Sequence, residues 1–194
     1  MALTFSSDAN RELEPLERGR LINIARSAIR AGVTGDKPAV PFEELTPALR
    51  VPRATFVTLE IDGALRGCVG TLDVSRPLGV DVAENAYAAA FSDPRFTPVT
   101  ASEVEALEIH ISILEAPEPI AAFSEDDLIR QLRPGIDGLI LSDRGRRATL
   151  LPAVWESVPD PREFVRQLKL KAGLPVDHWS ATLKISRYTT RSIP

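Results

Sequence analysis

A predicted β-hairpin in the first half of the chain constrains the fold more than any other sequence feature. Residues 55–61 alternate between apolar and polar side chains and are rich in β-branched types, which predicts a strand. An Asp-Gly pair, typical of hairpin turns, follows, and the stretch Leu65–Leu72 supplies the partner strand. Two glycines in this stretch, Gly67 and Gly70, allow either a neighbouring strand or a ligand to approach the backbone closely. The hairpin therefore predicts antiparallel pairing and contains a candidate site.

Hydrophobic periodicity predicts the remaining elements. Helices are expected over residues 8–31 (with the firm part starting at Pro15), 77–91, 124–132 and 160–173, with a turn or short helix at 152–155. Further strands are expected over residues 107–113, 139–141, 147–151 and 181–188, and the proline-rich segment 36–52 reads as an extended connector. These elements indicate an α+β fold with a largely antiparallel sheet and flanking helices. With 194 residues, the chain is expected to form a single domain over residues 1–194.

Composition excludes several classes of protein. The net charge of −4 argues against a protein that coats nucleic acid. A single cysteine rules out an intramolecular disulfide and fits a reducing compartment. The N-terminus does not have the pattern of a signal peptide, and no run approaches the roughly 20 apolar residues needed to span a bilayer. We therefore expect a cytoplasmic protein that binds neither nucleic acid nor membranes.

Cys68, the only cysteine, is the first candidate for catalysis. As a nucleophile or an acid/base group it would need a neighbouring cation or a histidine partner. The alternative is that Cys68 is a small, buried, apolar residue of a strand. His110 shares the polar face of its predicted strand with Glu108 and Ser112, so it could act as the base if that strand neighboured Cys68. The sequence does not fix that adjacency.

Two arginines are candidates for binding an anion. Arg66 and Arg95 lie in segments constrained by glycine or proline, where a fixed guanidinium can bind a carboxylate or phosphate through two hydrogen bonds. The alternative is that each arginine pairs with a local acid, for which Asp93 and Asp62 are available. The predicted ligand-binding set is completed by residues of the same two stretches, namely Gly67, Gly70, Thr71 and Asp93.

No sequence pattern indicates a metal or a cofactor. The two histidines and the single cysteine have no recognised zinc-ligand spacing, and the carboxylates do not follow a calcium-binding rhythm. The glycines around Cys68 match neither dinucleotide-binding nor phosphate-loop motifs. We therefore expect no metal site and no cofactor from the sequence.

Four stretches together resemble the AMMECR1 domain family. They occur in the family's order, and the resemblance spans residues 55–180. The only noted departure is Val69, where isoleucine is commoner, and this change is conservative. The four stretches are Leu65–Thr71, Asp93–Phe96, Leu150–Trp155, and Lys171–Leu174 together with Trp179.

The resemblance implies an α+β fold with a larger and a smaller lobe around a cleft, and it implies no established reaction. Prokaryotic members of the family are often encoded beside a Memo-type protein and a radical SAM protein, which implies a shared pathway. One hypothesis is therefore an accessory component of that pathway that binds a small anionic ligand or a protein segment. The alternative is an enzyme that uses Cys68 on a small anionic substrate.

Overall fold

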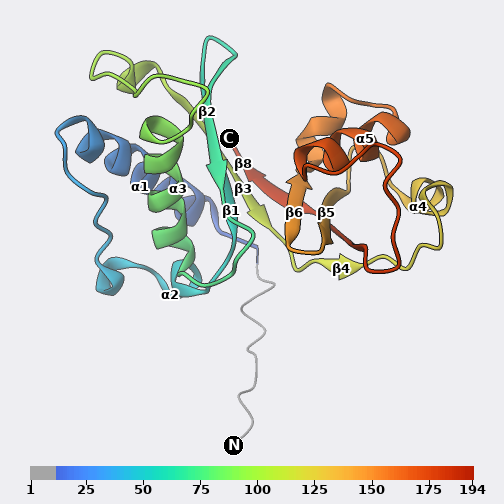
Figure 1. Ribbon diagram of the computed structural model, residues 1–194. Coiled ribbons are helices and arrows are strands. Elements are labelled where there is room, and N and C mark those ends of the chain that lie inside the picture. Colours follow the sequence, from blue (N-terminus) through green and yellow to red (C-terminus); the bar gives the residue numbers. More distant parts are fainter. Residues whose placement is uncertain (1–11) are drawn as a thin grey trace, which may run out of the picture. The chain divides into compact units, whose positions relative to one another are not determined.

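The computed structural model describes residues 12–194, which form two compact units (Figure 1). The first unit extends to Leu114 and also includes residues 192–194, and the second comprises residues 115–191. Each unit contains helices and one four-stranded sheet, which confirms the predicted α+β class. The sequence had not separated the strands into two sheets. No helix among residues 12–194 is both long and apolar enough to cross a membrane.

The first unit is built around a sheet with strand order β2-β1-β3-β8. Strand β1 pairs antiparallel with β2 on one side and with β3 on the other. The elements of this unit are α1 (Pro15–Val33), η2 (Phe42–Glu44), α2 (Pro47–Arg50), β1 (Thr55–Ile61), β2 (Ala64–Gly70), α3 (Leu78–Phe91), η3 (Val104–Ala106), β3 (Glu108–Leu114) and β8 (Thr190–Ile193).

The hairpin turn and the start of the first helix agree with the prediction from the sequence. Asp62 and Gly63 both have positive φ, as a type I′ turn requires, and they connect β1 to β2. Helix α1 starts at Pro15, where a proline is tolerated in the first turn. The predicted helical residues 8–11 lie outside the described part of the chain. The connector after α1 is not wholly extended, because the short helices η2 and α2 interrupt it.

Helices α1 and α3 cover one face of this sheet (Figure 1). The alternation in β1 and β3 turns every second side chain toward the helices, and these apolar side chains are almost fully buried. The alanine side chains of α3 are small, so the backbone of this helix can lie close to the sheet. The core includes Leu21, Ala25 and Ile29 of α1, Val82, Ala86 and Ala90 of α3, Val57 and Leu59 of β1, and Ile109, Ile111 and Ile113 of β3.

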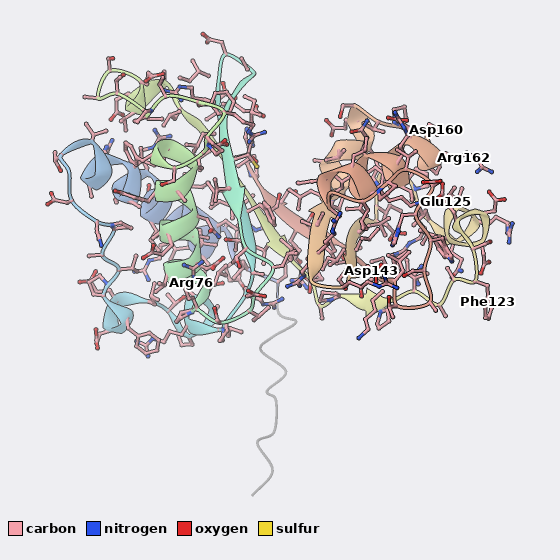
Figure 2. The ribbon with its side chains drawn as sticks, viewed as in Figure 1. Arg76, Phe123, Glu125, Asp143, Asp160 and Arg162 are labelled. Carbon is pink, nitrogen blue, oxygen red and sulfur yellow. The ribbon has the colours of Figure 1, made fainter. Side chains whose placement is uncertain are left out.

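A buried polar network fixes the start of β1 to α3. The Asp81 carboxylate accepts hydrogen bonds from the backbone N–H and the hydroxyl of Thr55, from Asn85 and from Arg76. Figure 2 shows Arg76 beside α3. Burial raises the pKa of Asp81, and the hydrogen bonds from Thr55 and the charge of Arg76 oppose that rise. The network sets the position of the hairpin that carries the candidate site.

The second unit contains a sheet with strand order β4-β7-β5-β6. The ring of Trp155 stacks on that of Phe164 at 3.8 Å in its core, and the indole N–H donates to the Asp137 carbonyl. The very short β4 and the final strand β8 were not expected from the sequence. The elements of this unit are β4 (Glu118–Pro119), α4 (Glu125–Gln131), β5 (Gly138–Asp143), β6 (Arg146–Leu150), η4 (Pro152–Glu156), α5 (Pro161–Lys171) and β7 (Lys184–Tyr188).

Candidate functional site

The first unit carries a group of polar side chains on the sheet face opposite α1 and α3. We call this group the polar face and define it as Thr58 and Glu60 of β1, Cys68 of β2, and Glu108 and His110 of β3. In the strand register, Thr58 lies between Cys68 and His110, and Glu60 lies opposite Glu108. The core residues Val57, Leu59, Ile109 and Ile111 alternate with these positions along the strands.

Cys68 is held by Thr58, Asp93 and Arg95, the last through its carbonyl, and has no histidine beside it. Its thiol accepts a hydrogen bond from the Thr58 hydroxyl at 3.2 Å, and its backbone N–H donates to Asp93 Oδ2 at 2.9 Å. Strand β1 separates β2 from β3, so the backbones of Cys68 and His110 are about 9–10 Å apart, which is two strand spacings. The strand adjacency that a direct Cys68–His110 pair requires is therefore absent.

Arg66 is the extra residue of a β-bulge. Leu59 pairs with Gly67, but the next residue of β1, Glu60, pairs with Leu65, so Arg66 has no partner in β1. A bulge of this kind redirects a side chain out of the regular alternation. The bulge accounts for the direction that the guanidinium takes.

The redirected Arg66 guanidinium closes the loop that follows α3. Nε and Nη2 donate to the two carboxylate oxygens of Glu103, at 2.8 and 3.2 Å. Nη1 donates to the carbonyl of Thr97 at 2.8 Å, and Nη2 also donates to that of Pro98 at 3.3 Å. The hydrogen bonds from Arg66 lower the pKa of Glu103 to about 2. Every nitrogen of this guanidinium therefore donates within the protein, and the acid that pairs with it is Glu103, not the expected neighbour Asp62.

Arg95 is held in a different way. Its Nε and Nη2 donate to the two oxygens of Asp93 at 2.9 and 2.7 Å, and Nη2 also donates to the Cys68 carbonyl at 3.3 Å. The Asp93 side chain is buried, whereas 54% of the Arg95 side chain is exposed. The hydrogen bonds from Arg95 hold the pKa of Asp93 well below its usual range, and the same pair raises the pKa of Arg95. Among residues 12–194, the remaining nitrogen, Nη1, donates to no group.

The glycines and Thr71 of the predicted ligand set make contacts within the protein. A Cβ on Gly67 would lie 2.2 Å from the carbonyl oxygen of Ala89 in α3. A Cβ on Gly70 would lie 2.3 Å from the Phe56 ring. The Thr71 hydroxyl accepts a hydrogen bond from the N–H of Asp73, which shapes the turn after β2. The close approach that these glycines permit is therefore an approach of protein groups.

The polar face also brings Glu60 to Glu108 and His110, which the sequence had connected only with each other. Glu60, Glu108 and His110 each offer one ligand atom, and these three atoms lie within 4.8 Å of one another. His110 Nε2 lies 3.6 Å from Glu60 Oε2. The alternation of polar residues in each strand was visible in the sequence, but the register that brings the strands together was not. Glu103, the partner of Arg66, was missed for the same reason.

A separate hollow of about 830 Å³ lies between α1 and the connector that follows it. Its wall is largely apolar, and charged side chains lie around it. None of the sequence-predicted site residues lines it. Its lining includes Ile24, Ala28, Val40, Leu45, Arg20 and Glu44.

The second unit contains a serine, a histidine and an aspartate in contact, but not as a catalytic triad. Asp143, labelled in Figure 2, accepts hydrogen bonds from His178, Ser180 and Thr182. Those from Thr182 and then His178 contribute most to lowering its pKa to about 2. In a triad the histidine lies between the serine and the aspartate. Here both donate to the same carboxylate, so the cluster holds the chain segment before β7 in place.

Comparison with known proteins identifies the family. The sequence model of the AMMECR1 family matches residues 22–193. A protein from Methanothermobacter thermautotrophicus is 41% identical over 167 residues, which cover 84% of this chain and 87% of that protein. A protein from Thermotoga maritima is 39% identical over 171 residues, covering 87% of this chain and 91% of that protein.

The fold agrees with a solved relative. The crystal structure of an uncharacterized protein from Pyrococcus horikoshii matches with a TM-score of 0.86 and 31% sequence identity. The match covers 93% of this chain and 92% of that one. On the evidence of its sequence and its fold, the chain belongs to the AMMECR1 family.

Proposed function

We propose that this chain is a binding component, and that the exposed edge of Arg95 receives an anionic group of its ligand. The partner classes, a Memo-type protein and a radical SAM protein, come from the family resemblance. The ligand group is a carboxylate or phosphate, carried by a small molecule of that pathway or by a segment of a partner. In this role the chain is an accessory protein that holds its ligand without transforming it.

The geometry of Arg95 carries this proposal. Asp93 fixes the guanidinium through two hydrogen bonds, and the Cys68 N–H in turn fixes Asp93. The side chain is therefore already ordered before a ligand arrives, which reduces the entropy lost on binding. Its Nη1 remains available for an acceptor.

The environment of Cys68 favours binding over covalent catalysis. A nucleophilic thiol needs a base or a free cation within contact distance. The Cys68 thiol instead meets the Thr58 hydroxyl, and the nearby Arg95 is already neutralised by Asp93. The enzyme alternative therefore depends on a base that another molecule would bring.

Replacing Arg95 with lysine tests the proposal while it keeps the positive charge of the side chain. Lysine keeps a cation beside the buried Asp93 but lacks the planar, two-pronged guanidinium and the free Nη1. The measurement is the affinity of the full chain for purified Memo-type and radical SAM proteins from the same organism, by biolayer interferometry. We expect Arg95→Lys to weaken binding at least about tenfold, the size of loss typical of an arginine at the centre of an interface that carries much of its binding energy.

Arg133→Lys provides the matched control. Arg133 also donates twice to the carboxylate of a buried aspartate, Asp137, and 49% of its side chain is exposed. This variant should bind the partners as the wild-type chain does. Unchanged binding by Arg95→Lys, or an equal loss in both variants, would contradict a specific role for Arg95.

A further inference from the structure

We infer that the polar face carries a site for a divalent transition-metal ion such as Zn²⁺ or Mn²⁺, with Glu60, Glu108 and His110 as its ligands. The site is distinct from the Arg95 edge described above, and it depends neither on Cys68 nor on the identity of a partner.

The strand register places the three ligands together. Glu60 lies directly opposite Glu108 on the neighbouring antiparallel strand. His110 is two residues beyond Glu108, so its side chain leaves the same face of the sheet and lies diagonal to Glu60. One ligand atom from each residue falls within a common span of 4.8 Å. Two adjacent strands thus supply three ligands from a rigid support.

The charge arrangement independently indicates a cation. Two carboxylates directly opposite each other on paired strands repel and destabilise the pairing. In the part of the chain that the structure describes, neither Glu60 nor Glu108 forms an ion pair with a lysine or arginine; His110 is the only partner of Glu60. Two other carboxylates near the hairpin, those of Asp93 and Glu103, are each neutralised by an arginine. A divalent cation would supply the missing positive charge.

The donor set selects the kind of ion. Carboxylate oxygens and an imidazole nitrogen suit zinc and other first-row transition metals, whereas Mg²⁺ and Ca²⁺ prefer oxygen ligands alone. Ligand bonds of about 2.0–2.2 Å would draw the three atoms to separations of about 3.4 Å around a tetrahedral ion. His110 and Glu60 are 40% and 31% exposed, so their side chains have room for that small movement. Three protein ligands leave a coordination position open for water or a further ligand.

Cobalt titration of the tag-free, full-length chain tests the site. Co²⁺ reports its coordination through visible absorption, and competition with Zn²⁺ and Mn²⁺ gives their relative affinities. We expect one ion per chain. The separate variants Glu60→Gln, Glu108→Gln and His110→Gln should each weaken binding about tenfold or more, because each removes one of only three ligands.

Two variants serve as controls for the titration. His178→Gln removes the other histidine of the chain, and Cys68→Ser removes the only thiol. Both should bind Co²⁺ as the wild-type chain does. Zn²⁺ should raise the melting temperature of the wild-type chain by mass action and raise that of folded Glu108→Gln by less at the same metal concentration.

Three results would overturn the inference. The first is the absence of Co²⁺, Zn²⁺ and Mn²⁺ binding by the wild-type chain up to millimolar metal. The second is equal affinity in the wild-type chain and the three ligand variants. The third is loss of binding in His178→Gln or Cys68→Ser, which would place the ion elsewhere.

Discussion

The guanidinium of Arg66 and the carboxylate of Glu103 form a two-pronged ion pair between residues 37 positions apart in the sequence. Only 15% of the Arg66 side chain is exposed, and its other hydrogen bonds go to the carbonyls of Thr97 and Pro98. The arginine of the Leu-Arg-Gly-Cys stretch thus fastens the loop after α3 to strand β2. Its main role in the described structure is to hold that loop.

Replacing Arg66 with alanine should therefore destabilise the chain. The change removes two charged hydrogen bonds from the Glu103 carboxylate, which keeps only those from Thr100, and leaves two carbonyl groups without this donor. This loss should cost on the order of 2 kcal/mol in free energy of unfolding. Urea denaturation of the full chain provides the measurement. Arg162→Ala is the control, since Arg162 and its partner Asp126 are 64% and 61% exposed (Figure 2 labels Arg162). That exposed pair should contribute less than about 1 kcal/mol. Equal losses in both variants would contradict the anchoring role.

Acid should weaken the fold through the same ion pair. The pKa of Glu103 falls from 4.5 to about 2 in the folded chain. Because the unfolded chain binds this proton more readily, the stabilisation is complete above about pH 4.5 and is lost as the pH falls toward 2. Asp93, whose pKa is also lowered by its arginine, adds a loss of the same sign. The free energy of unfolding should therefore decrease across this range.

Glu103→Gln identifies how much of the acid-induced loss in free energy of unfolding is due to Glu103. This variant should lose part of the pH dependence below pH 4.5, whereas Glu156→Gln, at an exposed position, should retain all of it. The measurement is the free energy of unfolding from urea titrations at several pH values. An unchanged slope in Glu103→Gln would rule out Glu103 as a source of the acid sensitivity.

A methyl group added at Gly67 should be costly, because it would meet the backbone of α3. The added Cβ would lie 2.2 Å from the Ala89 carbonyl oxygen, which cannot move without shifting the helix. We expect Gly67→Ala to lower the free energy of unfolding by about 1–3 kcal/mol. Gly19→Ala in α1, where a Cβ meets nothing within 4 Å, should instead raise it by about 0.5–1 kcal/mol. A Gly67→Ala chain as stable as wild type would show that the close approach is unimportant.

Local features of the fold could be predicted from the sequence. The Asp-Gly turn and the alternation of β1 and β3 depend on neighbouring residues, and all were predicted nearly to the residue. Strand β8 could not be recognised, because four residues after β7 carry too little periodicity and pair with a sheet built mainly from residues before 115.

The candidate site was predictable only in part. The sequence identified the Leu-Arg-Gly-Cys stretch as part of a candidate site. The direction of the Arg66 side chain could not be predicted, because it depends on a bulge that forms only when β2 pairs with β1. Likewise, His110 was placed on a polar face with Glu108, but its approach to Glu60 depends on the β1–β3 register. Side-chain alternation follows from the local sequence, whereas register follows from tertiary packing.

The affinity of the Cys68→Ser chain for its partners tests the central claim, that this chain is a binding component in which Cys68 does not act as a nucleophile. Serine preserves a hydrogen bond to Thr58 and the backbone contacts to Asp93 but removes the thiolate chemistry. The measurement is biolayer interferometry with the purified Memo-type and radical SAM proteins, alongside mass spectrometry of the wild-type chain after mixing. The account predicts equal affinity for the two chains and an unmodified Cys68. A covalent adduct on Cys68, together with loss of capture by a folded Cys68→Ser chain, would contradict it.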